Sequence, residues 1–141
     1  MTRMKRQPGS SYRPRVRNTR PRAAVERVVQ GSARPLTAIE ILEQGRAEIA
    51  GLGIATVYRA LGAMAADGIL DTIHLPNDAP RYQPHIDREH HFFICRSCHR
   101  VYWIFGSMPE VARMTPPGFV HENHSVYLYG TCAECRNLST A

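Results

Sequence analysis

All four cysteines of the chain stand in two Cys-x-x-Cys pairs, Cys95 with Cys98 and Cys132 with Cys135. Each pair can chelate one metal ion, and together the pairs supply the four soft ligands that Zn²⁺ accepts in a closed tetrahedral site. Because a closed site leaves no position for a substrate, the pattern predicts a structural zinc ion. Two alternatives stay open from the spacing: a disulfide framework, for which four cysteines allow three connectivities, and a redox-active pair.

A second group of possible ligands is the run Glu89-His90-His91. In an extended strand, Glu89 and His91 would point to one side and His90 to the other. Carboxylate and imidazole together suit Zn²⁺, Fe²⁺ or Mn²⁺ at the moderate affinity that a reversible sensor needs. The alternative is a solvated polar run without a metal. Isolated histidines such as His74 and His121 are more often surface residues, and we assign them no role.

Signatures of metal-dependent catalysis are absent. The zinc-hydrolase pattern H-E-x-x-H does not occur, since only Asn123 separates Glu122 from His124. Nucleobase deaminases need a proline directly before a Cys-x-x-Cys pair, and neither Cys95 nor Cys132 has one. We therefore expect the protein not to be an enzyme.

Positive charge is concentrated at the N-terminus. The chain carries a formal net charge of +6, and residues 1–22 contain eight of its 18 basic residues and no acidic one. Residues 1–16 are therefore predicted to form a disordered basic arm that is attracted to nucleic acid. A solvated tail that only aids solubility is the alternative. No secretory signal and no apolar run of about 20 residues is present, so we expect a soluble, cytoplasmic protein without a membrane partner.

The segment before Pro84 has the pattern of three helices and a hairpin. Apolar residues recur at helical spacing after Thr19, from the capping box of Thr37 and Glu40 to Ile49 with a weak point at Gly45, and over residues 55–66. Residues 69–75 and 81–83 then flank a turn and read as two strands. This order is typical of a winged helix-turn-helix. The third helix would present Thr56, Tyr58 and Arg59 to the major groove of duplex DNA.

The sequence leaves two alternatives to the recognition of DNA bases by the third helix. Tyr58 could belong to the core while Arg59 is only a solvated charge. The chain could also be a zinc-stapled module that binds RNA or protein without sensing a metal.

Beyond Pro84 the sequence predicts a small α/β module. Strand-like runs occupy residues 92–95, 101–105 and 119–129, and a short helix is expected at residues 109–114. So small a sheet exposes its edges, and pairing with a second copy covers them, so we expect a homodimer. The whole chain is thus predicted to be α+β.

Three segments, residues 53–61, 90–98 and 123–135, closely resemble the ferric uptake regulator family in sequence and in order. The resemblance implies a winged-helix DNA-binding domain at residues 17–84, joined by a hinge to a metal-binding dimerisation domain at residues 85–141. It further implies a homodimeric, metal-dependent repressor of iron or zinc uptake genes that binds a duplex operator. Arg17, Thr19 and Arg22 would lie near the DNA backbone.

The resemblance also assigns metal ligands. The four cysteines match the family's structural zinc site, and a regulatory site falls on four residues of the second domain, namely Glu89, His91, Glu110 and His124. The regulatory ion would be Zn²⁺ or Fe²⁺, with Mn²⁺ possible, and we expect it to favour the domain orientation that fits two half-sites.

A further site, which bridges the two domains in the family, is degenerate here. Pro35, Gln83 and Phe92 replace a histidine, an acid and a second histidine, while His90 is retained. The chain therefore either senses through the dimerisation-domain site, with His85 and His90 as possible additional ligands, or has lost metal sensing.

Overall fold

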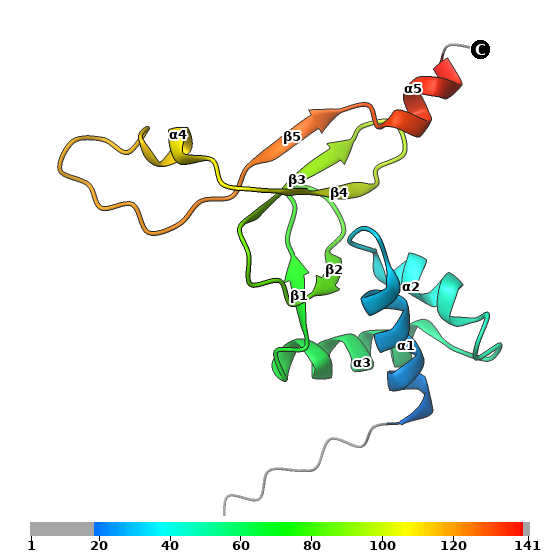
Figure 1. Cartoon of the computed structure of the whole chain (residues 1–141). Helices are drawn as coiled ribbons and strands as arrows, with labels where there is room; N and C mark the ends of the chain where they lie inside the picture. Colours follow the sequence, from blue (N-terminus) through cyan, green and yellow to red (C-terminus); the bar gives the residue numbers. More distant parts are fainter. Residues whose placement is uncertain (1–18, 140–141) are drawn as a thin grey trace, which may run out of the picture.

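The structure is a computed structural model that describes residues 19–139. Arg17 and the predicted basic arm lie outside this range. Three helices, α1 (Arg20–Gly31), α2 (Ala38–Gly45) and α3 (Ile54–Ala66), are followed by an antiparallel hairpin of β1 (Leu70–Ile73) and β2 (Arg81–Pro84) (Figure 1). This is the predicted winged helix-turn-helix.

Local chemistry sets where these helices begin. The Thr19 hydroxyl accepts the backbone N–H of Arg22, and Thr37 and Glu40 form the predicted capping box at the start of α2. The second helix was expected to continue to Ile49, but it ends at Gly45. A Cβ at this glycine would lie 2.7 Å from Cδ2 of Leu52, so the close approach of Leu52 favours a residue without a side chain here.

The core of the helical part is formed by the apolar faces of all three helices. Val25, Ile41, Val57 and Leu61 are among its fully buried members. The hairpin of β1 and β2 is the wing of this motif. An isolated β-bridge attaches it to the helical part, and in this bridge Leu36 and Tyr82 exchange backbone hydrogen bonds of 3.0 and 2.7 Å.

The second part of the chain contains a three-stranded sheet in the order β4–β3–β5. Strand β3 (His90–Cys95) pairs antiparallel with β4 (Val101–Phe105) and parallel with β5 (Tyr127–Gly130). Two short helices, α4 (Pro109–Ala112) and α5 (Ala133–Ser139), complete it. The predicted strand over residues 119–129 was too long, because only its last part lies beside β3. Helix α5 was not predicted.

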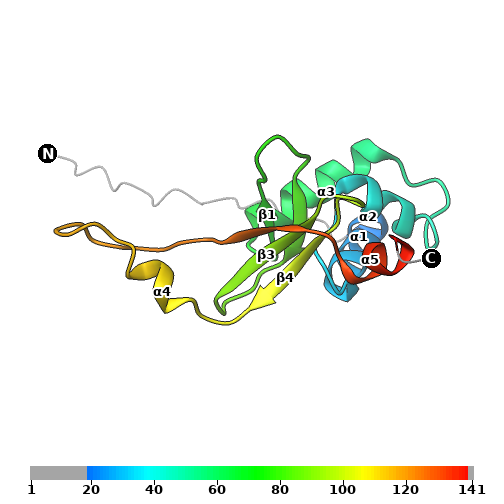
Figure 2. The same ribbon diagram turned by 90° about the horizontal axis from the view of Figure 1, so that it is seen from above.

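The connection between β4 and β5 projects away from the rest of the molecule and carries α4, as Figure 2 shows. Its apolar residues Phe119 and Val120 are 71% and 88% exposed. Without a neighbouring strand to pair with, this part of the connection cannot form the sheet that its composition predicts.

The wing and the sheet share a second core. Ile73 and Leu75 come from the wing and its following turn, while Phe92, Ile94 and Val101 come from β3 and β4. The predicted division between residues 84 and 85 falls at the end of β2, and it stays a prediction because this core crosses it. None of the helices in the described range is long and apolar enough to cross a membrane.

Candidate metal centres and nucleic-acid interface

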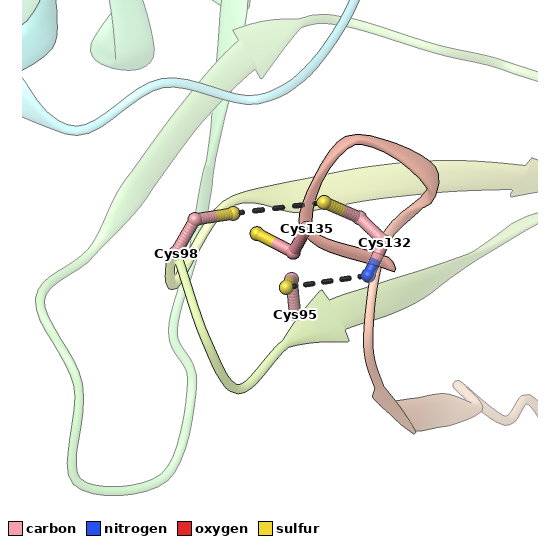
Figure 3. A group of neighbouring side chains, drawn as sticks. All are labelled: Cys95, Cys98, Cys132 and Cys135. Carbon is pink, nitrogen blue, oxygen red and sulfur yellow. Dashed lines mark hydrogen bonds between the residues drawn. The ribbon is translucent and has the colours of Figure 1, made fainter. Parts of the chain in front are cut away.

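The four cysteine sulfurs converge between the end of β3 and the start of α5 (Figure 3). They lie within 4.8 Å of one another, and the Sγ atoms of Cys98 and Cys132 are 3.8 Å apart. A zinc tetrahedron with Zn–S bonds near 2.3 Å has edges of about 3.8 Å. No disulfide joins any of the four cysteines, and the convergence of all four sulfurs favours a metal ion over the disulfide alternative. The donor set and its spacing are those of a structural zinc site.

The electrostatics of the cluster favour a bound cation. Backbone N–H groups of Cys98 and Cys132 lower the pKa of Cys95 to about 6, and the backbone N–H of Cys135 lowers the pKa of Cys132. Burial raises the pKa of Cys98, and the hydrogen bond with Cys132 raises the pKa of Cys135 to about 12. Two thiols therefore keep their protons unless a divalent cation compensates the charge of four thiolates.

Tight turns bring the two cysteine pairs together. The backbone N–H of Cys132 donates to Sγ of Cys95 at 3.3 Å, which joins the two pairs directly. After the first pair, His99 adopts a left-handed φ of 62° and its N–H donates to the carbonyl of Cys95 at 2.9 Å. This left-handed conformation is uncommon for residues other than glycine.

A second cluster unites three of the four predicted regulatory ligands. Nε2 of His91 and Nε2 of His124 each lie 3.2 Å from Oε1 of Glu89, and the two rings stack with centroids 5.4 Å apart. Glu89 and His91 therefore share a side, as the strand pattern predicted. Glu110 stands on α4 and is not part of this cluster.

The hydrogen bonds of the cluster leave one nitrogen open for a cation. Nδ1 of His91 accepts the backbone N–H of Val126 at 3.1 Å, so the proton of the neutral ring lies on Nε2, facing Glu89. Nδ1 of His124 is hydrogen-bonded to Nε2 of His121 at 2.9 Å. Nε2 of His124 is buried and makes no hydrogen bond, although the Glu89 carboxylate is near. A nitrogen and a carboxylate oxygen placed in this way fit a divalent cation.

His121, to which the sequence assigns no role, orients a predicted ligand through its hydrogen bond with His124. Partners of this kind commonly fix the tautomer of a ligating histidine. The spacing of His121 and His124 in a segment without regular structure gave no periodic signal by which this contact could have been found.

The two possible additional ligands, His85 and His90, form hydrogen bonds with different partners. His85 bonds through Nδ1 to Asp71 at 3.1 Å and through Nε2 to Asp87 at 2.7 Å, and these carboxylates raise the pKa of His85. The pairing with Asp71, from the opposite strand of the wing, was not predicted. His90 instead bonds to Gln83 at 3.0 Å.

The predicted base-reading residues lie at the start of α3. Tyr58 is 51% exposed, which excludes the alternative that it belongs to the core. Arg59 is exposed, and its Nη2 donates to Oγ1 of Thr56 at 3.1 Å. Thr19 and Arg22 border the same hollow as Thr56 and Arg59, so the start of α1 lies beside the predicted reading residues of α3.

Arg22 lies deeper than a phosphate contact requires. It is 9% exposed, and its Nη2 bonds to Oδ2 of Asp67 at 2.8 Å, which ties the start of α1 to the C-terminal end of α3. Nη1 of Arg22 is buried without a hydrogen-bond partner. Its clearest structural role is to hold α1 against α3.

We expect Asp67→Asn to lower the free energy of unfolding by about 2 kcal/mol, because it leaves the buried Arg22 guanidinium without a negatively charged partner. Asp67 is partly exposed, so the loss stays below that of a fully buried ion pair. Urea unfolding followed by circular dichroism measures the change. Asp87→Asn, at an exposed carboxylate that bonds to His85, is the matched control and should change it by less than about 0.5 kcal/mol.

The sequence matches a known protein family over most of its length. The model of the ferric uptake regulator family matches residues 14–129. The chain belongs to the ferric uptake regulator family. It is 32% identical over 127 residues to the zinc uptake regulation protein of Mycobacterium tuberculosis, covering 86% of this chain and 96% of that one.

Two solved structures of the family share this fold. The ferric uptake regulator from Francisella tularensis with iron aligns with a TM-score of 0.70 and 23% identity, over 85% of this chain and 94% of that one. A zinc uptake regulator complexed with zinc and DNA aligns with a TM-score of 0.56 and 24% identity, over 89% and 87%.

Membership of the ferric uptake regulator family places the chain among metal-responsive transcriptional regulators, which are not enzymes. The four-cysteine cluster and the cluster of Glu89, His91 and His124 are the two candidate metal centres in the described part of this family member.

Proposed function

We propose that the protein is a homodimeric repressor of zinc or iron uptake genes, which binds its duplex operator when a divalent metal occupies the cluster of Glu89, His91 and His124. The observation that carries this proposal is the buried, unbonded Nε2 of His124 beside the Glu89 carboxylate. A structural polar network would satisfy that nitrogen, whereas a reversible metal site leaves it free. Zn²⁺ is favoured by the zinc uptake regulator among its relatives, and Fe²⁺ suits the same donors.

The roles of the two parts follow from their surfaces. We assign residues 17–84 to DNA binding, since Tyr58 and Arg59 are exposed at the start of α3. We assign residues 85–141 to metal binding and dimerisation. Strand β5 lies at the edge of the described sheet, beside β3, and its Leu128 and Tyr129 are 45% and 47% exposed. A second copy that paired along this edge would cover both. Because a repressor acts on genes, we expect the protein in the cytoplasm.

The metal cluster lies where it can influence the dimer edge. Glu89 directly precedes β3 and His91 is the second residue of that strand, whereas His124 lies on the connection that leads into β5. Val126, the residue before β5, is held by His91 and by the N–H of Phe92. A bound divalent cation would join these segments by bonding to the Glu89 carboxylate and to Nε2 of His124, while His91 holds Val126 through its Nδ1. The ion changes DNA affinity only through its different affinity for the DNA-binding and the non-binding forms.

The ligand assignment makes a direct prediction. His124→Ala should weaken uptake of the second metal by about 100-fold or more while the cysteines keep their zinc, since it removes the one nitrogen that has no other partner. Isothermal titration with Zn²⁺ and Fe²⁺, combined with native mass spectrometry, gives the affinity and the number of ions per chain. His74→Ala, at an exposed histidine outside both clusters, is the control. Unchanged uptake in His124→Ala would assign the second metal elsewhere.

A second candidate function is a zinc-stapled DNA- or RNA-binding module that has lost metal sensing. It is favoured by Pro35 and Phe92, which cannot bind a metal, at two of the family's hinge positions. In that case the titration would find one zinc per chain and no second ion. Affinities for duplex DNA and RNA at matched salt would then separate the two nucleic-acid partners.

A further inference from the structure

Three polar side chains join the wing to the sheet at the hinge. Gln83, on β2, is only 2% exposed. Its Oε1 accepts the indole N–H of Trp103, on β4, at 2.7 Å, and its Nε2 contacts Nε2 of His90, on β3, at 3.0 Å. One buried amide thus links a strand of the wing to two strands of the sheet.

The donors and acceptors of this network match without an ion. Nδ1 of His90 lies 2.8 Å from the carbonyl of Arg88, so it carries the proton and donates it there. Nε2 of His90 is then an acceptor and takes an N–H from the Gln83 amide. The Gln83 oxygen accepts from Trp103. Gln83 is buried while His90 and Trp103 are half-buried. Because a satisfied network around a buried amide holds its members in one geometry, it rigidifies the hinge.

Further contacts surround the network. The wing residues Ile73 and Leu75 pack in the core formed with β3 and β4, and Trp103 packs against that core. Arg81, 3% exposed on β2, donates through Nη2 to the carbonyl of His99 at 2.8 Å. The wing is therefore attached both to the sheet and to the turn that follows the first cysteine pair.

A bridging metal does not fit these residues. Gln83 is a neutral amide whose oxygen is occupied by Trp103, and Nε2 of His90 is occupied by Gln83. Pro35 and Phe92, at the two remaining hinge positions, have no ligand atom, and both are buried.

We propose that Gln83, Trp103 and His90 form a metal-free latch that replaces a metal bridge at the hinge and holds the DNA-binding helices in a fixed orientation on the sheet. This inference rests on the proposed function and concerns its regulation. The latch sets the orientation of each reading helix within its own protomer. The metal at Glu89, His91 and His124 then acts on the connection to β5 and not on the hinge. Gln83 and Trp103 are then positioning residues for DNA binding.

The test uses Trp103, the single tryptophan of the chain. The full-length protein, labelled with ¹⁵N and loaded with zinc at the cysteines only, should give one indole N–H resonance whose exchange with solvent is slow. Gln83→Leu, which keeps the approximate size but removes both hydrogen bonds, should accelerate that exchange by about tenfold. Backbone ¹⁵N relaxation should show both parts of the wild type tumbling together, and tumbling independently in the variant.

Gln44→Leu, at an exposed glutamine of α2, is the matched control and should leave exchange and tumbling unchanged. Trp103→Phe removes the donor but keeps an aromatic ring, and it should reproduce the independent tumbling if Gln83→Leu fails to fold. Equal indole exchange in wild type and Gln83→Leu, or independent tumbling of the wild type without a hinge metal, would overturn the latch.

DNA binding separates positioning from general stability. Both latch variants should lose at least about tenfold in affinity for a duplex with two half-sites, yet bind a single half-site within about twofold of wild type. Equal losses on both duplexes would contradict a positioning role. The exchange and relaxation measurements use no DNA, so they decide the latch even if the proposed repressor function fails.

Discussion

Replacing Cys132 with serine should release the zinc ion and unfold the part of the chain that contains β3, β4 and β5. The four sulfurs are the main link between the end of β3 and α5, and the described C-terminal part has only a small core. Structural zinc contributes about 10–16 kcal/mol of binding free energy in small domains, so loss of one thiolate should cost about 5 kcal/mol or more. At this domain size the melting temperature should fall by roughly 20 °C.

Calorimetry and zinc content, measured on the same preparations, check this prediction. Ser97→Ala is the matched control, because Ser97 is exposed between two of the cysteines and contributes only its backbone to the site. A Cys132→Ser protein that keeps its zinc or melts normally would show that the cluster is not a structural zinc site.

Replacing Arg59 with alanine should weaken sequence-specific DNA binding by about 5- to 150-fold without lowering stability. A guanidinium that contacts a base edge contributes about 1–3 kcal/mol of discrimination. Arg59 is exposed, and its only described hydrogen bond is to Thr56 in the same helix, so its removal disturbs no packing. Fluorescence anisotropy with specific and scrambled duplexes at one salt concentration measures the ratio of the two affinities.

Arg113→Ala removes the same charge from an exposed position after α4. It should alter specific and scrambled binding equally and only slightly, since it lies outside the winged helix. If Arg59→Ala behaved like Arg113→Ala, α3 would not read the operator.

Short-range patterns predicted most of the fold. The N-caps at Thr19 and Thr37, the helical spacing of α3 and the alternation before the wing turn all depend on neighbours within a few residues. The predictions were wrong where contacts with residues distant in the sequence determine the structure. Residues 119–126 have strand-like composition but no strand beside them, and α2 ends early where Leu52 packs on Gly45.

The candidate sites, too, were predictable only where they depend on short-range patterns. The cysteine spacing predicted one cluster, and alternation along β3 separated His91 from His90. Contacts across the fold were not predictable in this way. His121 meets His124 in an irregular segment, Asp71 reaches His85 across the wing, and Gln83 reaches Trp103 across the hinge.

The most direct test of the proposed function is the affinity of zinc-stapled protein for DNA before and after the second metal is added. A duplex selected from fragments of the encoding genome serves as the probe, and Zn²⁺ and Fe²⁺ are titrated separately. We predict that one of these ions tightens binding about 100-fold, equivalent to about 2.7 kcal/mol, and that His124→Ala abolishes the gain. Tight binding that is the same within about twofold with and without the second metal would contradict a metal-dependent repressor.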